Sequence, residues 1–176
     1  VSVCGTMQNF IGNDGSKNVA LRNRNAYREG AGCRGIFMSS DSVKLDDERS
    51  GTMALTTNSN DGISYRTAWM KAGWGTPLLD FWDDFSDDGK LTDRTSDIST
   101  PNASLAVSKT IPAKRTRDFT FYITWHFPNR YAWSPTRIGN YYTTQYSDAW
   151  NVIEKTLPKL SDLERETVEF VSAFCA

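Results

Sequence analysis

Short stretches rich in β-branched and aromatic residues recur along most of the chain and are separated by turn-forming residues. Residues 1–10 alternate two sets of side chains at a period of two, which predicts a first strand. Five further stretches are short and rich in β-branched and aromatic residues: GIFMSS (35–40), GTMALTT (51–57), ISYRTAW (63–69), ASLAVSKT (103–110) and DFTFYITWHF (118–127). Turn formers such as Asn60-Asp61-Gly62 separate them. This spacing predicts a mainly β chain that folds as an antiparallel β-sandwich.

Residues 11–35 interrupt this pattern. They are rich in glycine, asparagine and arginine and show little periodicity. Such a composition predicts a long loop or an insertion with local turns.

Residues 78–89, LLDFWDDFSDDG, change the hydrophobic period from two to that of a helix. Leu78, Leu79, Trp82 and Phe85 fall on one face, and the aspartates fall largely elsewhere. The pattern predicts a short amphipathic helix that buries its apolar face against a sheet and ends near Gly89.

A second helical region is predicted from about Ser147, with a break at Pro158. A capping box that starts at Ser161 predicts a further helix, whose apolar stripe is Leu163, Phe170, Val171 and Phe174. We therefore divide the chain into a β-sandwich domain, residues 1–146, and a C-terminal helical linker, residues 147–176, which leads toward another domain.

The charge balance narrows the range of partners. Lys and Arg together number 20 against 21 Asp and Glu, so the net charge is -1 and there is no long-range field to attract nucleic acid. No apolar run approaches the roughly 20 residues of a membrane span, and no signal peptide is visible within these residues. We expect neither a nucleic-acid partner nor a membrane span.

No cofactor, metal site or catalytic group is predicted. Acidic residues come in runs that are typical of solvated faces, and no pair suited to acid–base chemistry stands out. Residues 84–89 resemble half of a calcium loop, but Thr95 occupies the position of its bidentate Glu, so helix termination is the better interpretation. His126, the single histidine, lies in an apolar strand pattern and is expected to be structural.

The three cysteines lack the spacing of a zinc or redox site. We expect Cys4 and Cys175 to pack as small apolar residues on a strand and a helix, and Cys33 to lie in a glycine-rich loop.

Three stretches, in this order, resemble the N-terminal domain of family 116 β-glucosidases and non-lysosomal glucosylceramidases. They are GIFMSSDSVKLDDERSGTMALTT, ISYRTAWMKAGWGTPLLDFWDDFSDDGKL and FYITWHFPNRYAWSPTRIGNYYTTQYSDAWNVIEKTLPKL. In addition, residues 9–12 match an Asn-x-x-Gly turn that follows a strand in relatives. The resemblance covers essentially the whole chain.

The resemblance implies a large non-catalytic β-sandwich followed by an α/α toroid that carries the two catalytic carboxyl groups. No catalytic residue is therefore transferred to this chain, and we expect the chain alone to be inactive. The family's sandwich extends further toward the N-terminus than Val1, so residues 1–146 are expected to be its later portion. Missing strands would leave an apolar edge or face uncovered.

Residues 125–142, WHFPNRYAWSPTRIGNYY, follow the last predicted strand and precede the helical linker. Arg130, Trp133, Tyr141 and Tyr142 are of the types enriched at protein contacts, so we predict that they face the catalytic domain or the rim of its cleft. Alternatively, these aromatic residues close the end of the sandwich core. The alternative function is a stand-alone carbohydrate-binding module, which needs a row of exposed aromatic residues on one sheet face.

Overall fold

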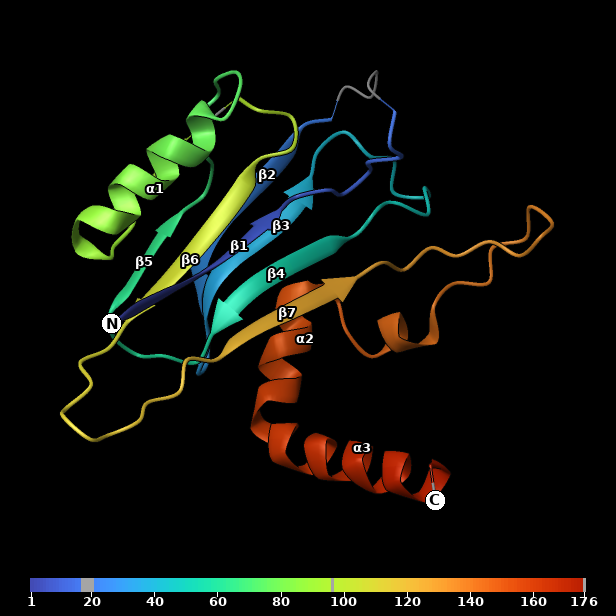
Figure 1. Cartoon of the computed structure of the whole chain (residues 1–176). Helices are drawn as coiled ribbons and strands as arrows, with labels where there is room; N and C mark the ends of the chain where they lie inside the picture. The colour runs from blue at the N-terminus through green and yellow to red at the C-terminus, as the bar shows by residue number, and fades with distance from the viewer. Residues whose placement is uncertain (17–20, 96, 176) are drawn as a thin grey trace.

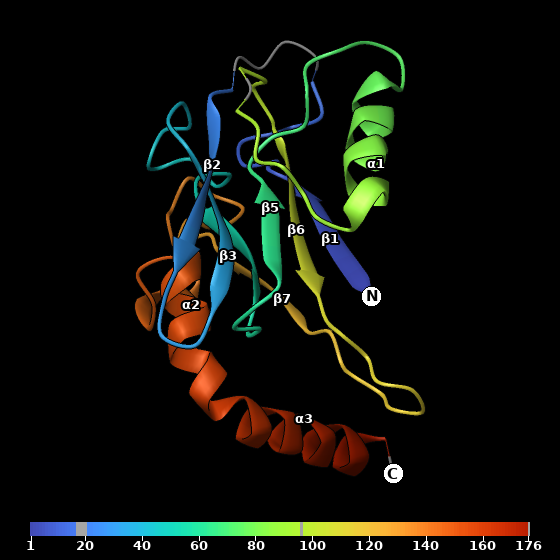
Figure 2. The ribbon, with the colours of Figure 1, turned by 90° about the vertical axis from the view of Figure 1, so that its left-hand side faces the viewer.

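The computed structural model of the chain describes residues 1–16, 21–95 and 97–175. Two antiparallel sheets pack face to face, and each outer face carries a helix (Figure 1). The layers follow in the order α1, three-stranded sheet, four-stranded sheet, α2, as the view in Figure 2 shows. The predicted fold class, a mainly β antiparallel sandwich with a short helix and C-terminal helices, is confirmed.

The three-stranded sheet has the order β1 (Ser2–Gln8), β6 (Asn102–Ser108) and β5 (Ile63–Arg66). β1 pairs with β6 along its whole length, from Ser2 opposite Ser108 to Gln8 opposite Asn102. The strands predicted near residues 1–10, 63–69 and 103–110 are therefore confirmed. β5 is shorter than its sequence stretch because it ends at Arg66.

The four-stranded sheet has the order β2 (Asn23–Glu29), β3 (Arg34–Ser40), β4 (Thr52–Thr57) and β7 (Phe121–His126). The long loop predicted for residues 11–35 is wrong, because β2 pairs with β3 over seven residues within it. β2 is an edge strand with mostly exposed or half-buried side chains, so it needs no apolar alternation. Residues 17–20 of this stretch lie outside the described residues.

The core lies between the two sheets. Its side chains come from the inward-facing positions of both: Ile36, Met38, Met53 and Leu55 from the larger sheet, Ala103 and Leu105 from the smaller, and Ile11 from the turn after β1. Each of these large apolar side chains is at most 3% exposed, and burial of one contributes roughly 1.5–3 kcal/mol. The alternation within each strand thus decides which face closes the sandwich.

Helix α1 (Thr76–Asp88) ends where the sequence predicts, but the face that it turns toward the sheet is not the predicted one. Gly89 has a left-handed φ of 74°, and its N–H donates to the Phe85 carbonyl at 2.9 Å. The predicted burial of Leu78, Leu79 and Trp82 is wrong, since these side chains are 57%, 62% and 57% exposed. Phe81 is the buried residue of the helix and stacks on Trp69 with ring centroids 4.8 Å apart.

Arg66, at the end of β5, explains this orientation. Its side chain is completely buried, and its Nη1 and Nη2 lie 2.7 Å from Asp80 and 3.0 Å from Asp84. Its Nε donates to the Thr92 carbonyl at 3.1 Å. A buried guanidinium is strongly unfavourable without opposite charges. Because Asp80 and Asp84 are one helical turn apart, α1 must turn its acidic side toward the sheet to reach Arg66.

The C-terminal region is helical, as predicted. It contains α2 (Ala149–Thr156), a 3-10 turn η2 (Leu157–Lys159) and α3 (Leu160–Phe174). Asp148 caps α2 by accepting the Asn151 N–H at 2.7 Å, and the predicted break at Pro158 takes the form of η2. α2 packs its buried residues on the outer face of the four-stranded sheet.

α3 turns away from α2 and extends beyond the sheets (Figures 1 and 2). It starts at Leu160 after Lys159, which makes no side-chain cap, so the capping box predicted at Ser161 is wrong. The predicted apolar stripe is present on the helix, but its side chains are exposed within this chain: Leu163, Phe170, Val171 and Phe174.

The three cysteines are free. Cys33 is buried under α2 in the loop between β2 and β3, and Cys4 is half-buried beneath α1, as expected. Burial raises the pKa of both thiols. The expectation for Cys175 is wrong, because it is exposed at the end of α3.

Candidate domain interface

Residues 127–146 connect β7 to α2. An outgoing arm leads away from β7, and a returning arm leads back to α2. The Phe127 N–H donates to the Tyr142 hydroxyl at 3.0 Å, and the Asn140 side-chain amide donates to the Phe127 carbonyl at 2.9 Å. Pro128 and Pro135 prevent this segment from continuing the sheet. Hydrogen bonds between the arms therefore hold the segment together.

The outgoing arm is also fixed to the loop between β3 and β4. The buried Asn129 side chain donates to the carbonyls of Leu45 and Asp47 at 2.7 and 2.8 Å. The Tyr131 hydroxyl donates to the Asp46 carbonyl at 2.8 Å. The base of the segment is thus ordered by groups that lie about 80 residues earlier in the sequence.

Asp47 stabilises that loop through Arg49. Its carboxylate accepts the Arg49 Nε at 2.9 Å and the Arg49 backbone N–H at 2.8 Å. Side-chain and backbone hydrogen bonds from Arg49 lower the pKa of Asp47 to about 2. A carboxyl whose pKa is lowered by folding stabilises the fold above its unfolded pKa of about 3.9, and this contribution disappears as the pH falls through 2.

We therefore expect Asp47 to titrate near pH 2 in a carboxyl NMR titration. Replacing Arg49 by Ala should raise the pKa of Asp47, because the side-chain hydrogen bonds and the opposite charge are lost. Asp97, whose pKa is lowered by its hydrogen bond and ion pair with Lys71, serves as the control, because Arg49 does not contribute to this shift. An unchanged Asp47 titration in this variant would contradict the assignment.

The tip of the segment is a small hairpin. Tyr131 and Arg137 form an antiparallel bridge, and the Ile138 N–H donates to the Arg130 carbonyl at 2.9 Å. Trp133 lies at its tip and is fully exposed. Arg130 and Ile138 are also exposed. In Figure 1 this orange hairpin projects away from the sheets.

The two tyrosines lie on the 3-10 turn η1 (Tyr141–Thr144) of the returning arm. Tyr141 is 83% exposed, whereas Tyr142 is half-buried and meets His126 edge to face, with ring centroids 6.2 Å apart. His126 is buried, and its Nε2 lies 2.9 Å from the Tyr146 carbonyl oxygen. His126 thus positions this arm, in keeping with its expected structural role.

Below, the term junction surface refers to five residues of this segment: Arg130, Trp133, Ile138, Tyr141 and Tyr142. The structure places the four residues predicted from the sequence on one segment but on two separate parts of it, the hairpin and η1. Trp133 and Tyr141 do not fill the core, because both are exposed. Tyr142 alone packs partly inward.

A second exposed apolar area, on β7, was not predicted from the sequence. Ile123 and Trp125 pair with Leu55 and Met53, two core residues, so they face the inner side of the four-stranded sheet. Both are nevertheless 57% exposed. The opposite sheet ends at β1, where a Cβ on Gly5 would lie 3.4 Å from the Phe121 ring, and it does not cover the rest of β7.

We call Ile123 and Trp125 the open edge. Together with Thr124, Tyr142 and Val152, they line a mostly apolar groove of about 300 Å³ beside β7. The alternating apolar positions of DFTFYITWHF are the signal that could have identified Ile123 and Trp125, had the register of β7 been known.

Two acidic residues near the end of α1, Asp84 and Asp88, have structural partners. Asp84 accepts the Thr92 N–H at 2.9 Å and contacts Arg66. Burial alone would raise the pKa of Asp84, but the hydrogen bonds from Thr92 and the charge of Arg66 lower it. Within residues 1–16, 21–95 and 97–175, no three His, Cys, Asp or Glu side chains are grouped to hold a metal ion.

None of the helices in the described part of the chain combines the length and apolar character that crossing a bilayer requires.

Comparison with known sequences identifies the family. The sequence model described as beta-glucosidase 2, glycosyl-hydrolase family 116 N-terminal domain, matches residues 1–163 of the 176. The match spans both sheets, α1, α2 and the start of α3. A search of curated proteins gave no match. Because the family model covers nearly all of it, the chain belongs to the N-terminal domain of glycosyl-hydrolase family 116.

Proposed function

We propose that this chain is a non-catalytic part of a family 116 glycoside hydrolase of the β-glucosidase or glucosylceramidase type. It supports an α/α toroid catalytic domain of the same polypeptide through the junction surface. The observation that carries this proposal is the state of Trp133, which is fully exposed although the base of its hairpin is firmly hydrogen-bonded. An ordered, exposed tryptophan is typical of a contact surface.

The position of the junction surface supports the same role. It lies on the segment between β7 and α2, and α2 leads directly into α3. α3 presents an exposed stripe that includes Phe170 and Phe174, whose rings stack with centroids 5.9 Å apart. Residues 147–176 therefore serve, in this proposal, as a helical linker: α2 packs on the sandwich, and α3 packs its exposed apolar stripe on the catalytic domain.

We further propose that residues 1–146 are the later portion of a larger sandwich. The open edge supports this, because Ile123 and Trp125 face the inside of the sandwich without a covering strand. A strand placed next to β1 would cover both side chains and would also pair the free edge of β1. In this proposal a further strand covers the open edge and the catalytic domain covers the junction surface, and the two areas adjoin at Tyr142.

The carboxyl groups whose pKa is clearly shifted have hydrogen-bond or ion-pair partners within the domain. The clear shifts found for carboxyl groups in the described residues are downward, at Asp14, Asp47, Asp84 and Asp97. Hydrogen bonds or opposite charges cause the net lowering in each case.

A stand-alone carbohydrate-binding module with an aromatic platform has less support. Such a module needs a row of exposed rings on one sheet face. The outer faces of both sheets carry helices, and the most exposed tryptophans, Trp74 and Trp133, lie on loops.

The isolated chain is expected to release no nitrophenol from 4-nitrophenyl β-glucoside above the rate in buffer, because no pair of carboxyl groups suited to the reaction stands out in the sequence. The assay follows absorbance with the purified chain and with a heat-denatured sample as the control. Hydrolysis that disappears when one Asp or Glu of the chain is replaced would overturn the non-catalytic assignment.

A further inference from the structure

The outer face of the three-stranded sheet is only partly covered by α1. Cys4 and Ala106 form a pair on this face and lie beneath the aromatic side chains of the helix. Two positions further along, the Thr6 and Ser104 hydroxyls are 2.9 Å apart. The last pair of the ladder joins Gln8 and Asn102. The face therefore becomes more polar as it emerges from beneath α1.

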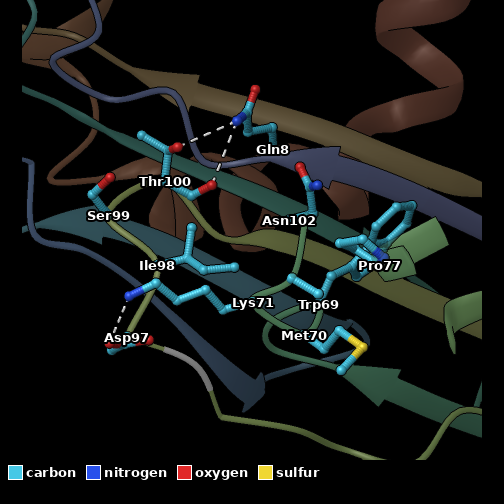
Figure 3. A pocket seen from close by; sticks show the side chains of 11 residues that line it. Gln8, Trp69, Met70, Lys71, Pro77, Asp97, Ile98, Ser99, Thr100 and Asn102 are labelled. Atoms are coloured by element: carbon cyan, nitrogen blue, oxygen red, sulfur yellow. Dashed lines mark hydrogen bonds and ion pairs between the residues drawn. The ribbon is translucent and has the colours of Figure 1, made fainter. Parts of the chain in front are cut away.

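A cavity of about 520 Å³ lies at this polar end, between the sheet and two loops. Figure 3 shows Gln8, Thr100 and Asn102 on one wall, with Trp69 and Lys71 from the loop after β5 on another. The volume falls within the range of roughly 300–1,000 Å³ that is usual for small-molecule sites. These elements differ from those that form the junction surface.

Trp69 gives the cavity a rigid aromatic wall. Its Nε1–H donates to the Ser104 hydroxyl at 2.8 Å, and its ring stacks on Phe81. Since the hydrogen bond and the stacking together fix the orientation of the ring, binding a ligand would not require this side chain to be ordered.

The polar groups of the lining are largely neutral. Gln8 donates to the Thr100 hydroxyl at 3.3 Å, and Asn102 lies opposite Gln8 in the strand ladder. The charged groups that line the cavity, Lys71 and Asp97, are paired with each other at 2.9 Å. Carboxamides and hydroxyls both donate and accept hydrogen bonds, so they match a ligand that carries several hydroxyl groups. The paired charges favour a neutral ligand.

We propose that this cavity binds one glycosyl unit of a neutral carbohydrate. An aromatic ring packs against the apolar side of a pyranose, while amides and hydroxyls bind its hydroxyl groups. This site goes beyond the proposed supporting function and does not depend on it. It also differs from an aromatic platform, because it offers one ring and a set of amides within a cavity.

The test is an NMR titration of the ¹⁵N-labelled chain with D-glucose and with cellobiose. Saturable shifts are expected for the Trp69 indole N–H and for the side-chain amides of Gln8 and Asn102. Glycerol, a polyol without a pyranose ring, is the control ligand. Shifts that do not saturate, or glycerol shifts equal to those of the sugars at the same concentration, would overturn the proposal.

Two variants locate the binding. Gln8→Ala combined with Asn102→Ala should weaken binding by about tenfold or more, since two hydrogen-bonding groups are lost. Gln145→Ala removes an exposed carboxamide next to η1 and should leave binding unchanged. Gln8 is exposed, so Gln8→Ala alone keeps the fold and should still weaken binding. Equal affinity in the Gln8 and Gln145 variants would show that the sugar binds elsewhere.

Discussion

Replacing Asp80 and Asp84 together by asparagine is expected to lower the free energy of unfolding by about 3–5 kcal/mol. The Arg66 side chain is completely buried, and these two carboxylates are the acidic groups in ion-pair contact with it. Both carboxylates are themselves shielded, with side chains 18% and 21% exposed, so solvent screens the pairs only partly. Neutralising them leaves a buried cation without compensation.

Urea denaturation of the double variant measures this effect. Asp83→Asn, on the exposed side of the same helix, is the matched control and should change stability by less than about 0.5 kcal/mol. Adding Arg66→Met to the double variant should recover part of the loss, because the buried charge is then removed. A double variant within about 1 kcal/mol of the parent chain would show that Arg66 does not control the orientation of α1.

Trp150→Ala is expected to lower the free energy of unfolding by about 3–5 kcal/mol, the range for removing a large buried ring. Trp150 is buried between α2 and the four-stranded sheet, next to Phe37 and Ala54. Its Nε1–H also donates to Glu154 at 3.0 Å. The variant should increase hydrogen exchange throughout α2, because this ring is the largest side chain that attaches the helix.

Trp82→Ala is the control for this prediction, since it removes the same side chain from a site that is 57% exposed. It should destabilise the chain much less than Trp150→Ala does. From the sequence, Trp82 is predicted to be buried as part of the apolar face of a helix, so its removal would be expected to be costly. Equal losses in the two variants would contradict the orientation of α1 or the packing of α2.

Most strands could be predicted because they are short runs of β-branched and aromatic residues between turn formers. β1 and β7 also show an alternation of more and less exposed side chains. β2 could not be predicted, since its sequence NRNAYRE is polar and the strand is defined by its backbone pairing with β3 and by side-chain contacts with distant segments. A polar edge strand contributes hydrogen bonds more than buried area, and a hydrophobic pattern does not detect it.

The orientation of α1 could not be predicted from the helix itself. Its local pattern favours burial of Leu78 and Trp82, and the decisive charge lies on Arg66, 14 residues before Asp80. The free-energy penalty for an unpaired buried guanidinium exceeds the gain from covering two partly exposed apolar side chains. Only the tertiary structure shows that Arg66 is buried.

The segment that carries the junction surface could be recognised in the sequence because prolines and contact-type residues mark it between a strand and a helix, and its role as a domain contact stays a prediction. The exposure of these side chains could not be predicted, since the burial of Trp133 and Tyr142 depends on how the hairpin and η1 pack. Predicting the open edge from the sequence would also have required the register of β7 against β4.

Oxidative footprinting of Trp133 and Tyr141 tests the proposed domain contact most directly. The isolated chain should be compared with the same chain joined to a family 116 catalytic domain. Trp74 is as exposed as Trp133 and lies outside the junction surface, so it provides the internal control. Trp133 and Tyr141 should be oxidised readily in the isolated chain and protected in the two-domain protein, while Trp74 reacts in both. Equal reactivity of Trp133 and Trp74 in the two-domain protein would contradict the account.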